Sequence, residues 1–164
     1  MKNRAILIIL SLLLFTGITP SQAQSYQTGS YQTGVGIRMG NTGGISVKHF
    51  MDGRHAVEGI LSARWGGIGV TGLMEWHKEA FRTERLNFYY GFGGHVYLGR
   101  YQRYRRHYYY ESRSAIGIDG ILGLEYHLPR APITGSLDWK PAINLIGRTG
   151  YHEGGLALTV RYAF

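Results

Sequence analysis

The chain contains no cysteine among its 164 residues. This absence excludes a disulfide framework, a thiol nucleophile, a cysteine-ligated metal and a lipidated cysteine anchor. Its seven histidines form no HxH or HxxxH pair, so we expect no metal site and no cofactor. After residue 23, no segment is continuously apolar over the roughly 20 residues that a membrane-spanning helix needs. If this chain crosses a membrane, it must therefore do so with strands.

Residues 1–23 have the pattern of a secretory signal peptide. A basic start is followed by an apolar run over residues 5–15 and by small residues before a cleavage site after Ala23. The apolar run is too short to span a bilayer, which makes an uncleaved anchor the weaker alternative. The sequence therefore predicts export from the cytoplasm, which argues against nucleic acid as a partner.

Glycine and tyrosine are both abundant, with 25 and 13 residues. Disordered glycine-rich chains contain few aromatic residues. Here the glycines lie inside alternating apolar segments, where they permit bends, bulges and close backbone approach. About 140 residues remain after the signal peptide, enough for one domain. We predict a leader over 24–33 and a single β domain over 34–164. The motif SYQTG begins in the leader and occurs twice in succession.

Alternation of apolar and polar residues predicts eight strands in that domain. Glycine pairs, an Asp-Gly turn and a proline-containing turn separate several of them. An even number of strands lets both ends of the domain lie on the same side. The sequence therefore predicts an all-β fold, an eight-stranded antiparallel up-and-down transmembrane β-barrel, with strands near 34–40, 44–51, 56–65, 68–77, 86–99, 115–128, 134–145 and 154–164.

The two faces of these strands differ in charge. One face is apolar, whereas the other carries five basic and five acidic residues, predicted to form an ionic network: Arg38, Lys48, Arg64, Lys140, Arg161, Glu58, Glu75, Asp119, Glu125 and Asp138. Side chains fill the interior of an eight-stranded barrel, and an open pore for solutes needs about 16 strands. Because an unpaired buried charge costs several kcal/mol, this balance predicts an occluded lumen filled by ion pairs.

The last ten residues alternate large apolar side chains with small or polar ones. Tyr162 and Phe164 lie on the apolar face, and Arg161 lies on the other. This pattern is typical of a strand that faces lipid. In a secreted or periplasmic lipocalin-like carrier the faces would be reversed, with the apolar face inside. The strand pattern leaves that alternative open, although a terminal aromatic residue is not expected of such a carrier.

Residues 100–114 form the longest predicted connection, with five arginines and six aromatic or imidazole rings. Basic residues among aromatic ones can bind a polyanion such as the phosphates of lipopolysaccharide. The simpler interpretation is a loop at the membrane surface, with tyrosines at the interface and arginines near anionic headgroups. The candidate contact residues are Arg100, Arg103, Arg105, Arg106, Tyr108, Tyr109, Tyr110 and Arg113.

Three stretches, Asn87–His95, Gly117–Tyr126 and Pro132–Pro141, together with the closing Arg161–Phe164, resemble the small outer-membrane β-barrel proteins of Bacteroidetes-type bacteria. The resemblance covers roughly the second half of the chain. It implies an OmpA- or OmpX-like barrel in the outer membrane of a Gram-negative cell, in contact with membrane lipid and lipopolysaccharide. It also implies insertion by the barrel-assembly machinery, which would recognise the terminal aromatic strand. The resemblance implies no catalytic site; because eight strands are too few for a solute pore, we expect a structural or adhesive role, and the oligomeric state stays open.

A barrel enzyme that trims or transfers acyl chains of lipid A is the remaining alternative. Such a hydrolase needs a serine, a histidine base and an orienting acid within hydrogen-bond reach. His95, Glu125 and Ser136 are candidates, but a lipid would have to reach them through the barrel wall. His152 and Glu153, on a predicted loop, have no serine beside them. We therefore expect no enzymatic activity.

Overall fold

The computed structural model describes residues 31–64, 67–81, 83–102, 110–147 and 150–164. For residues 64, 83–84, 100–102, 110–113 and 150–154 it describes the backbone alone. The expected signal peptide and most of the expected leader lie outside these ranges. Among the described residues there is no helix of the length and apolarity that crossing a bilayer requires.

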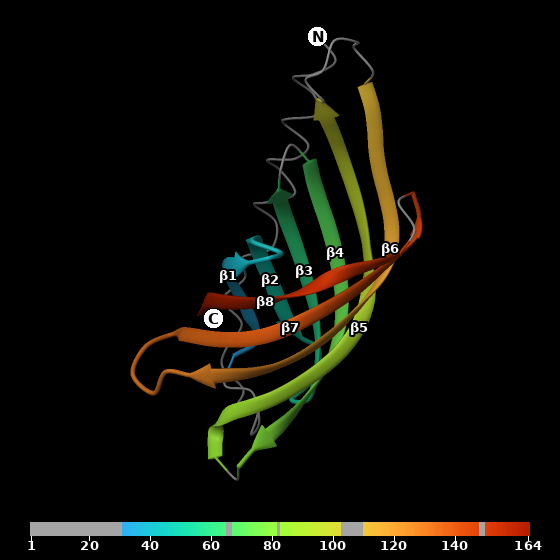
Figure 1. Ribbon diagram of the computed structural model, residues 1–164. Coiled ribbons are helices and arrows are strands. Elements are labelled where there is room, and N and C mark those ends of the chain that lie inside the picture. The colour runs from blue at the N-terminus through green and yellow to red at the C-terminus, as the bar shows by residue number, and fades with distance from the viewer. Residues whose placement is uncertain (1–30, 65–66, 82, 103–109, 148–149) are drawn as a thin grey trace.

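The described residues form one closed, all-antiparallel barrel, as the alternation predicts. Each strand pairs with the next, and β1 pairs with β8 to close the sheet. Figure 1 shows the strands in this order around the wall. The strands are β1 (Thr33–Gly40), β2 (Gly44–Phe50), β3 (His55–Arg64), β4 (Gly67–Ala80), β5 (Thr83–Gln102), β6 (Tyr110–His127), β7 (Ile133–Ile146) and β8 (Gly150–Ala163). The predicted eight-stranded antiparallel fold is confirmed.

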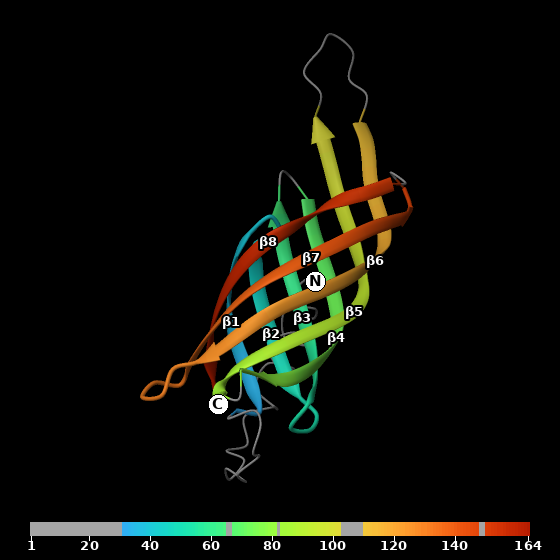
Figure 2. The ribbon, with the colours of Figure 1, turned by 60° about the horizontal axis from the view of Figure 1, so that its bottom comes forward.

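The hairpin of β5 and β6 is much longer than the rest of the barrel. These strands have 20 and 18 residues, against 8 and 7 for β1 and β2. β4 pairs with β5 only as far as Gly99, and β7 pairs with β6 only from Ile116 onward. The hairpin therefore projects past the other strands, as Figure 2 shows.

This projection corrects the predicted connections. Residues 100–102 and 110–114 are strand, because the β5–β6 register continues without interruption past the rim. The expected loop over 100–114 is therefore wrong at both of its ends, and its middle lies outside the described residues. In the same way, β8 begins at Gly150 and includes the backbone of His152 and Glu153, which were expected on a loop.

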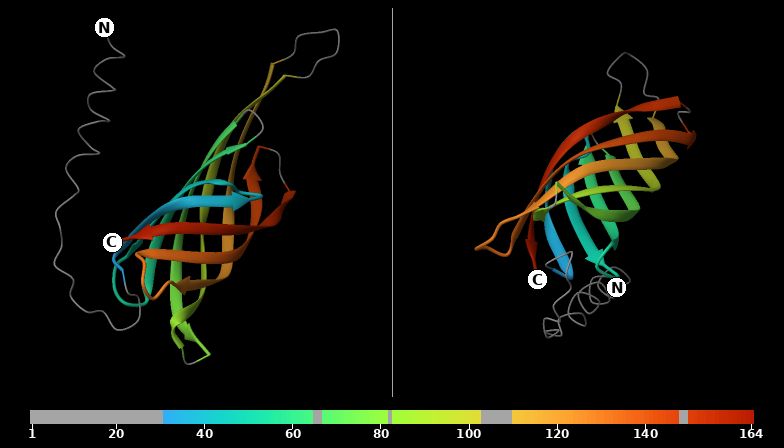
Figure 3. Two further views of the ribbon diagram at one scale, coloured as in Figure 1. Left: turned by 90° about the vertical axis from the view of Figure 1, so that its left-hand side faces the viewer. Right: turned by 90° about the horizontal axis from the view of Figure 1, so that it is seen from below.

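Backbone hydrogen bonds fix the barrel end that holds both termini of the domain. The amides of Gln32 and Thr33 donate to the carbonyl of Phe164, at 3.2 and 2.8 Å, and the amide of Phe50 donates to the carbonyl of Gln32 at 2.8 Å. Figure 3 shows β1 and β8 side by side, with the C-terminus at this end. The residue that precedes β1, Gln32, is therefore hydrogen-bonded to the strands at this end of the barrel.

The apolar face of the strands points outward and the charged face points inward. Leu156 on β8 is 67% exposed and Ile68 on β4 is 58% exposed, whereas the side chains of Lys48 and Arg161 are fully buried. Successive side chains of a strand alternate between the two sides of the wall, so a single register sets this pattern along each strand. The orientation is the reverse of the one that a lipocalin-like carrier requires.

Candidate functional site

The lumen is the candidate functional site, and seven of the eight strands contribute charged side chains to it. Of the ten residues expected in the ionic network, nine have buried side chains: Arg38, Lys48, Glu58, Glu75, Asp119, Glu125, Asp138, Lys140 and Arg161. The tenth, Arg64, lies at the end of β3, and its side chain is outside the described part of the chain.

Five of these residues meet at the centre of the lumen. Arg161 contacts Glu58 through Nη2, at 2.6 Å from Oε1, and Glu125 through Nη1, at 3.2 Å from Oε2. The Lys48 ammonium lies 2.7 Å from Glu75 Oε2, 3.3 Å from Glu125 Oε2 and 3.6 Å from Glu58 Oε2. The contact between Lys48 on β2 and Glu125 on β6 joins opposite walls. We call these five residues the central cluster.

Serine hydroxyls complete the hydrogen bonding of the central arginine. Arg161 Nε donates to Ser46 Oγ, and Arg161 Nη1 donates to Ser136 Oγ, both at 2.9 Å. The Ser46 hydroxyl in turn donates to Glu58 Oε1 at 2.6 Å. Buried ion pairs stabilise a fold only when their remaining hydrogen-bonding groups also find partners. The two serines serve this purpose, although the sequence prediction considered only Ser136, and in another role.

A second ion pair lies nearer the β5–β6 hairpin. The Arg38 guanidinium binds both oxygens of Asp138, with Nη1 at 2.8 Å from Oδ2. Its remaining donors reach Thr159 Oγ1 at 3.3 Å and Thr42 Oγ1 at 3.1 Å. The Tyr89 hydroxyl also donates to Asp138, at 3.0 Å. This two-pronged geometry is the strong form of an arginine–carboxylate pair.

A third group lies beside the second. The Lys140 ammonium contacts Asp119 Oδ1, and His95 Nδ1 lies 2.8 Å from Asp119 Oδ2. The other ring nitrogen of His95 lies 2.9 Å from Asn144 Oδ1. The sequence prediction placed His95 inside the barrel but did not identify Asn144 as its partner.

Aromatic side chains fill the lumen between these charges. The ring of Tyr89 lies under the Lys48 ammonium, 4.1 Å from it, and stacks on His77 at 5.0 Å between ring centroids. Gly123 on β6 is opposite Tyr89, and a Cβ at that position would lie 2.7 Å from Tyr89 Cζ and 2.6 Å from Asp138 Cβ. Glycine is therefore needed at position 123 to give the tyrosine ring its space.

Tyr31 packs against the lumen from the end that holds the termini. Its hydroxyl donates to Glu125 Oε1 at 3.0 Å. Its ring packs edge-on against Phe50 at 5.0 Å and stacks on His127 at 4.9 Å. The sequence prediction assigned Tyr31 to the leader and gave it no role. Period two would have placed it outside with Val35, so no local signal could have found this contact.

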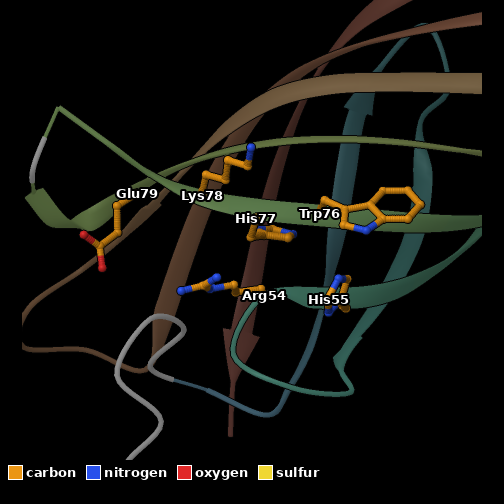
Figure 4. Close-up of a pocket in the computed structure, with 6 residues that line it drawn as sticks. All are labelled: Arg54, His55, Trp76, His77, Lys78 and Glu79. Carbon is orange, nitrogen blue, oxygen red and sulfur yellow. The ribbon is translucent and has the colours of Figure 1, made fainter.

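A separate hollow of about 500 Å³ lies at the same end of the barrel, beside the turn between β2 and β3. It is lined by Arg54, His55, Trp76, His77, Lys78 and Glu79. Figure 4 shows Lys78 and Glu79 on the same strand with their charged ends pointing away from each other. Its lining mixes charges of both signs and includes none of the residues that the sequence analysis identified.

The residues considered for a hydrolytic triad do not come together. His95 contacts Asp119 and Asn144, whereas Ser136 accepts a hydrogen bond from Arg161 at the centre of the lumen. Within the described ranges, no group of three or more histidine, cysteine or acidic residues is arranged to hold a metal ion.

The other expected sites lie outside the lumen. Tyr162 and Phe164 are exposed on the outer wall, with ring centroids 6.2 Å apart. Three of the candidate contact residues lie on β5 or β6, where the structure describes the backbone but not their side chains: Arg100, Tyr110 and Arg113. The remaining candidates fall at 103–109, outside the described residues: Arg103, Arg105, Arg106, Tyr108 and Tyr109.

A closed eight-stranded barrel with a charged interior and an apolar exterior is the class that this fold defines. No protein-family model matches the chain, and no curated protein matches it. Among solved structures it is similar to the N-terminal β-barrel domain of OprF from Pseudomonas aeruginosa, with a TM-score of 0.65 and 11% sequence identity. The match covers 82% of this chain and 99% of that domain. This likeness shows the fold, a closed β-barrel like that of the OprF domain.

Proposed function

We propose that the protein is an exported outer-membrane barrel with an occluded lumen and a structural or interaction role. The observation that carries the proposal is the direction of the side chains. Soluble proteins seldom expose contiguous apolar patches larger than a few hundred Å². Here large apolar side chains are exposed on every strand, and nine charged side chains of the predicted ionic network are buried inside the barrel.

Exterior aromatic rings support a membrane location. Trp76 stacks with Tyr90 at 6.0 Å and with Phe92 at 5.4 Å between ring centroids. Tyr162 and Phe164 lie on the last strand, toward the end that holds the termini. Aromatic residues gather at both interfaces of transmembrane barrels, where their amphipathic rings are most stable. We propose that the final aromatic strand is also the signal read by the barrel-assembly machinery, as in the Bacteroidetes-type barrels that the sequence resembles.

The cross-lumen ion pairs favour a structural role over transport. Lys48 joins β2 to β6, and Arg161 joins β8 to β3. A solute would have to break these buried pairs, and breaking one costs several kcal/mol. The hydrogen-bonding positions of His95 and Ser136 are occupied by partners that do not form a triad, so our proposal includes no catalysis.

We further propose that the projecting β5–β6 hairpin contacts the phosphates of lipopolysaccharide. The hairpin extends beyond its neighbouring strands, and the sequence at its tip is rich in arginine. A basic residue near an anionic lipid surface contributes about 1 kcal/mol to binding. Three arginines would therefore contribute roughly a hundredfold in affinity at low salt.

The test replaces Arg103, Arg105 and Arg106 together by glutamine in the full barrel, refolded into phosphatidylcholine vesicles. Binding of lipopolysaccharide and of its dephosphorylated form is then measured by light scattering at two salt concentrations. We expect the triple variant to lose the salt-sensitive part of the affinity. The matched control replaces three exposed arginines at the opposite end, Arg54, Arg85 and Arg130. Equal affinity of both variants, or no preference for the phosphorylated form, would refute the contact.

A further inference from the structure

The charges of the central cluster do not balance. Glu58, Glu75 and Glu125 supply three carboxyl groups, whereas Lys48 and Arg161 supply two positive charges. The side chains of all five are fully buried. If every carboxyl group were ionised, one negative charge would be uncompensated inside the barrel, at a cost of several kcal/mol. The cluster therefore needs one more positive charge.

Two oxygen atoms indicate where that charge is bound. Glu58 Oε2 and Glu75 Oε1 are buried and have no hydrogen-bond partner among the described residues. The two carboxyl groups lie on the neighbouring strands β3 and β4 and face the same Lys48 ammonium, at 3.6 Å from Glu58 Oε2 and 2.7 Å from Glu75 Oε2. An ionised carboxylate only accepts hydrogen bonds, so a proton on one of the two groups would neutralise the excess negative charge and supply a donor where these buried oxygens have none. We infer that Glu58 and Glu75 form a binding site for one proton, which they share between these oxygens.

His77 is the other group that could hold the proton, and its surroundings disfavour it. Its Nε2 lies 3.1 Å from Glu75 Oε2, to which a neutral ring can donate. Its Nδ1 is buried and has no partner in the described part of the chain, so protonation there would create an unsatisfied N–H group. The Lys48 ammonium contacts the same Glu75 oxygen at 2.7 Å, and a second cation beside it would be repelled. The carboxyl pair is the better site.

The groups that face the cluster from the other elements do not change the count. Ser46 and Ser136 are neutral and bind Arg161. The remaining neighbours are two neutral phenols, a stacked imidazole and an ion pair that is balanced in itself: Tyr31, Tyr89, His127, and Arg38 with Asp138. One bound proton makes the whole assembly neutral. This inference rests on the lumen alone and holds whether or not the hairpin binds lipopolysaccharide.

The test is the pH dependence of unfolding of the full barrel in phosphatidylcholine vesicles, measured in urea from neutral to alkaline pH. Unfolded glutamates are ionised above about pH 4.3, so unfolding releases the shared proton. The unfolding constant should therefore rise about tenfold per pH unit until the folded barrel also loses the proton. Glu75→Gln places an amide N–H donor beside Glu58 at every pH. We expect this variant to lose the slope and to keep the stability of the wild type at neutral pH.

Asp138→Asn is the matched control, because it makes the same chemical change in the balanced pair with Arg38. It should lower stability and leave the slope unchanged. Infrared spectra of the wild type provide a second readout, which does not depend on any variant folding: a protonated carboxyl band should be present at neutral pH. An equal slope in wild type and Glu75→Gln, or an absent carboxyl band, would overturn the proposal. So would a His77 imidazolium signal in NMR, or an unfolding constant that depends on sodium at fixed ionic strength.

Discussion

Replacing Arg161 by methionine tests the luminal network most sharply. The arginine forms ion pairs with Glu58 and Glu125 and donates hydrogen bonds to Ser46 and Ser136. Methionine fills a similar length but offers no charge and no donor. The change would therefore leave two buried carboxylates with less compensation while preserving most of the packing.

The size of the effect follows from what each carboxylate retains. Glu58 keeps the Ser46 hydroxyl, and Glu125 keeps the Tyr31 hydroxyl and the Lys48 ammonium. Removing one partner of a buried ion pair costs about 3–5 kcal/mol. Because neither carboxylate is left entirely without donors, we expect Arg161→Met to lower the free energy of unfolding by about 4 kcal/mol. The loss should be smaller in acid, where a proton can neutralise the freed carboxylate.

The assay is reversible urea unfolding of the refolded barrel in lipid vesicles, followed by tryptophan fluorescence. Arg85→Met, at an exposed position, is the control and should change stability by less than about 0.5 kcal/mol. Adding Glu125→Gln to Arg161→Met should recover about 1–3 kcal/mol, because the two residues are in contact. A loss below about 1 kcal/mol for Arg161→Met would refute the account of a buried ionic network.

Three further predictions concern the wall and the turns. Leu122 lies on the outer wall between Tyr90 and Trp139, and Leu122→Arg should cost about 2–4 kcal/mol of folding free energy in vesicles. The control, Leu128→Arg at the rim, should cost at most about 1 kcal/mol. Equal costs would contradict the lipid-facing assignment of Leu122. Deleting Phe164 should reduce the amount of folded barrel in outer-membrane fractions, and unchanged assembly would exclude the terminal aromatic as a signal. Hydrogen bonds from the His55 side chain and from the Arg54 and His55 amides lower the pKa of Asp52 to about 2. This turn should therefore keep its support until the pH falls through about 2, and an NMR titration with an ordinary midpoint would contradict the geometry.

The fold could be predicted from the sequence because period two is a local signal. Alternate side chains of a strand lie on the same face, so all the apolar residues of one strand indicate the same outward face. A shift of the register by one residue would exchange the two faces. That is why the buried positions of Arg38 on β1 and Arg161 on β8 follow from their immediate neighbours. The pairing of charges across the lumen does not follow, because it depends on which strands face each other after closure.

The features that the sequence did not predict are of this long-range kind. Tyr31 reaches the lumen because backbone hydrogen bonds hold the next residue, Gln32, against Phe50 and Phe164 at the end of the barrel. The β5–β6 register continues beyond the rim, so residues 100–102 and 110–114 are strand, although arginine, tyrosine and serine there give no clear alternation. Asn144 on β7 contacts His95 on β5, with β6 between them, and nothing in its local sequence indicates a partner 49 residues away.

The most direct test of a membrane barrel with its apolar face outward is fractionation of expressing cells, combined with gel mobility before and after boiling. We expect the mature protein in the outer-membrane fraction, with a folded form that migrates differently from the boiled form. The same protein recovered as a soluble periplasmic or secreted species, with no heat-dependent shift, would contradict the proposal and show that the exposed apolar wall is covered by something other than lipid.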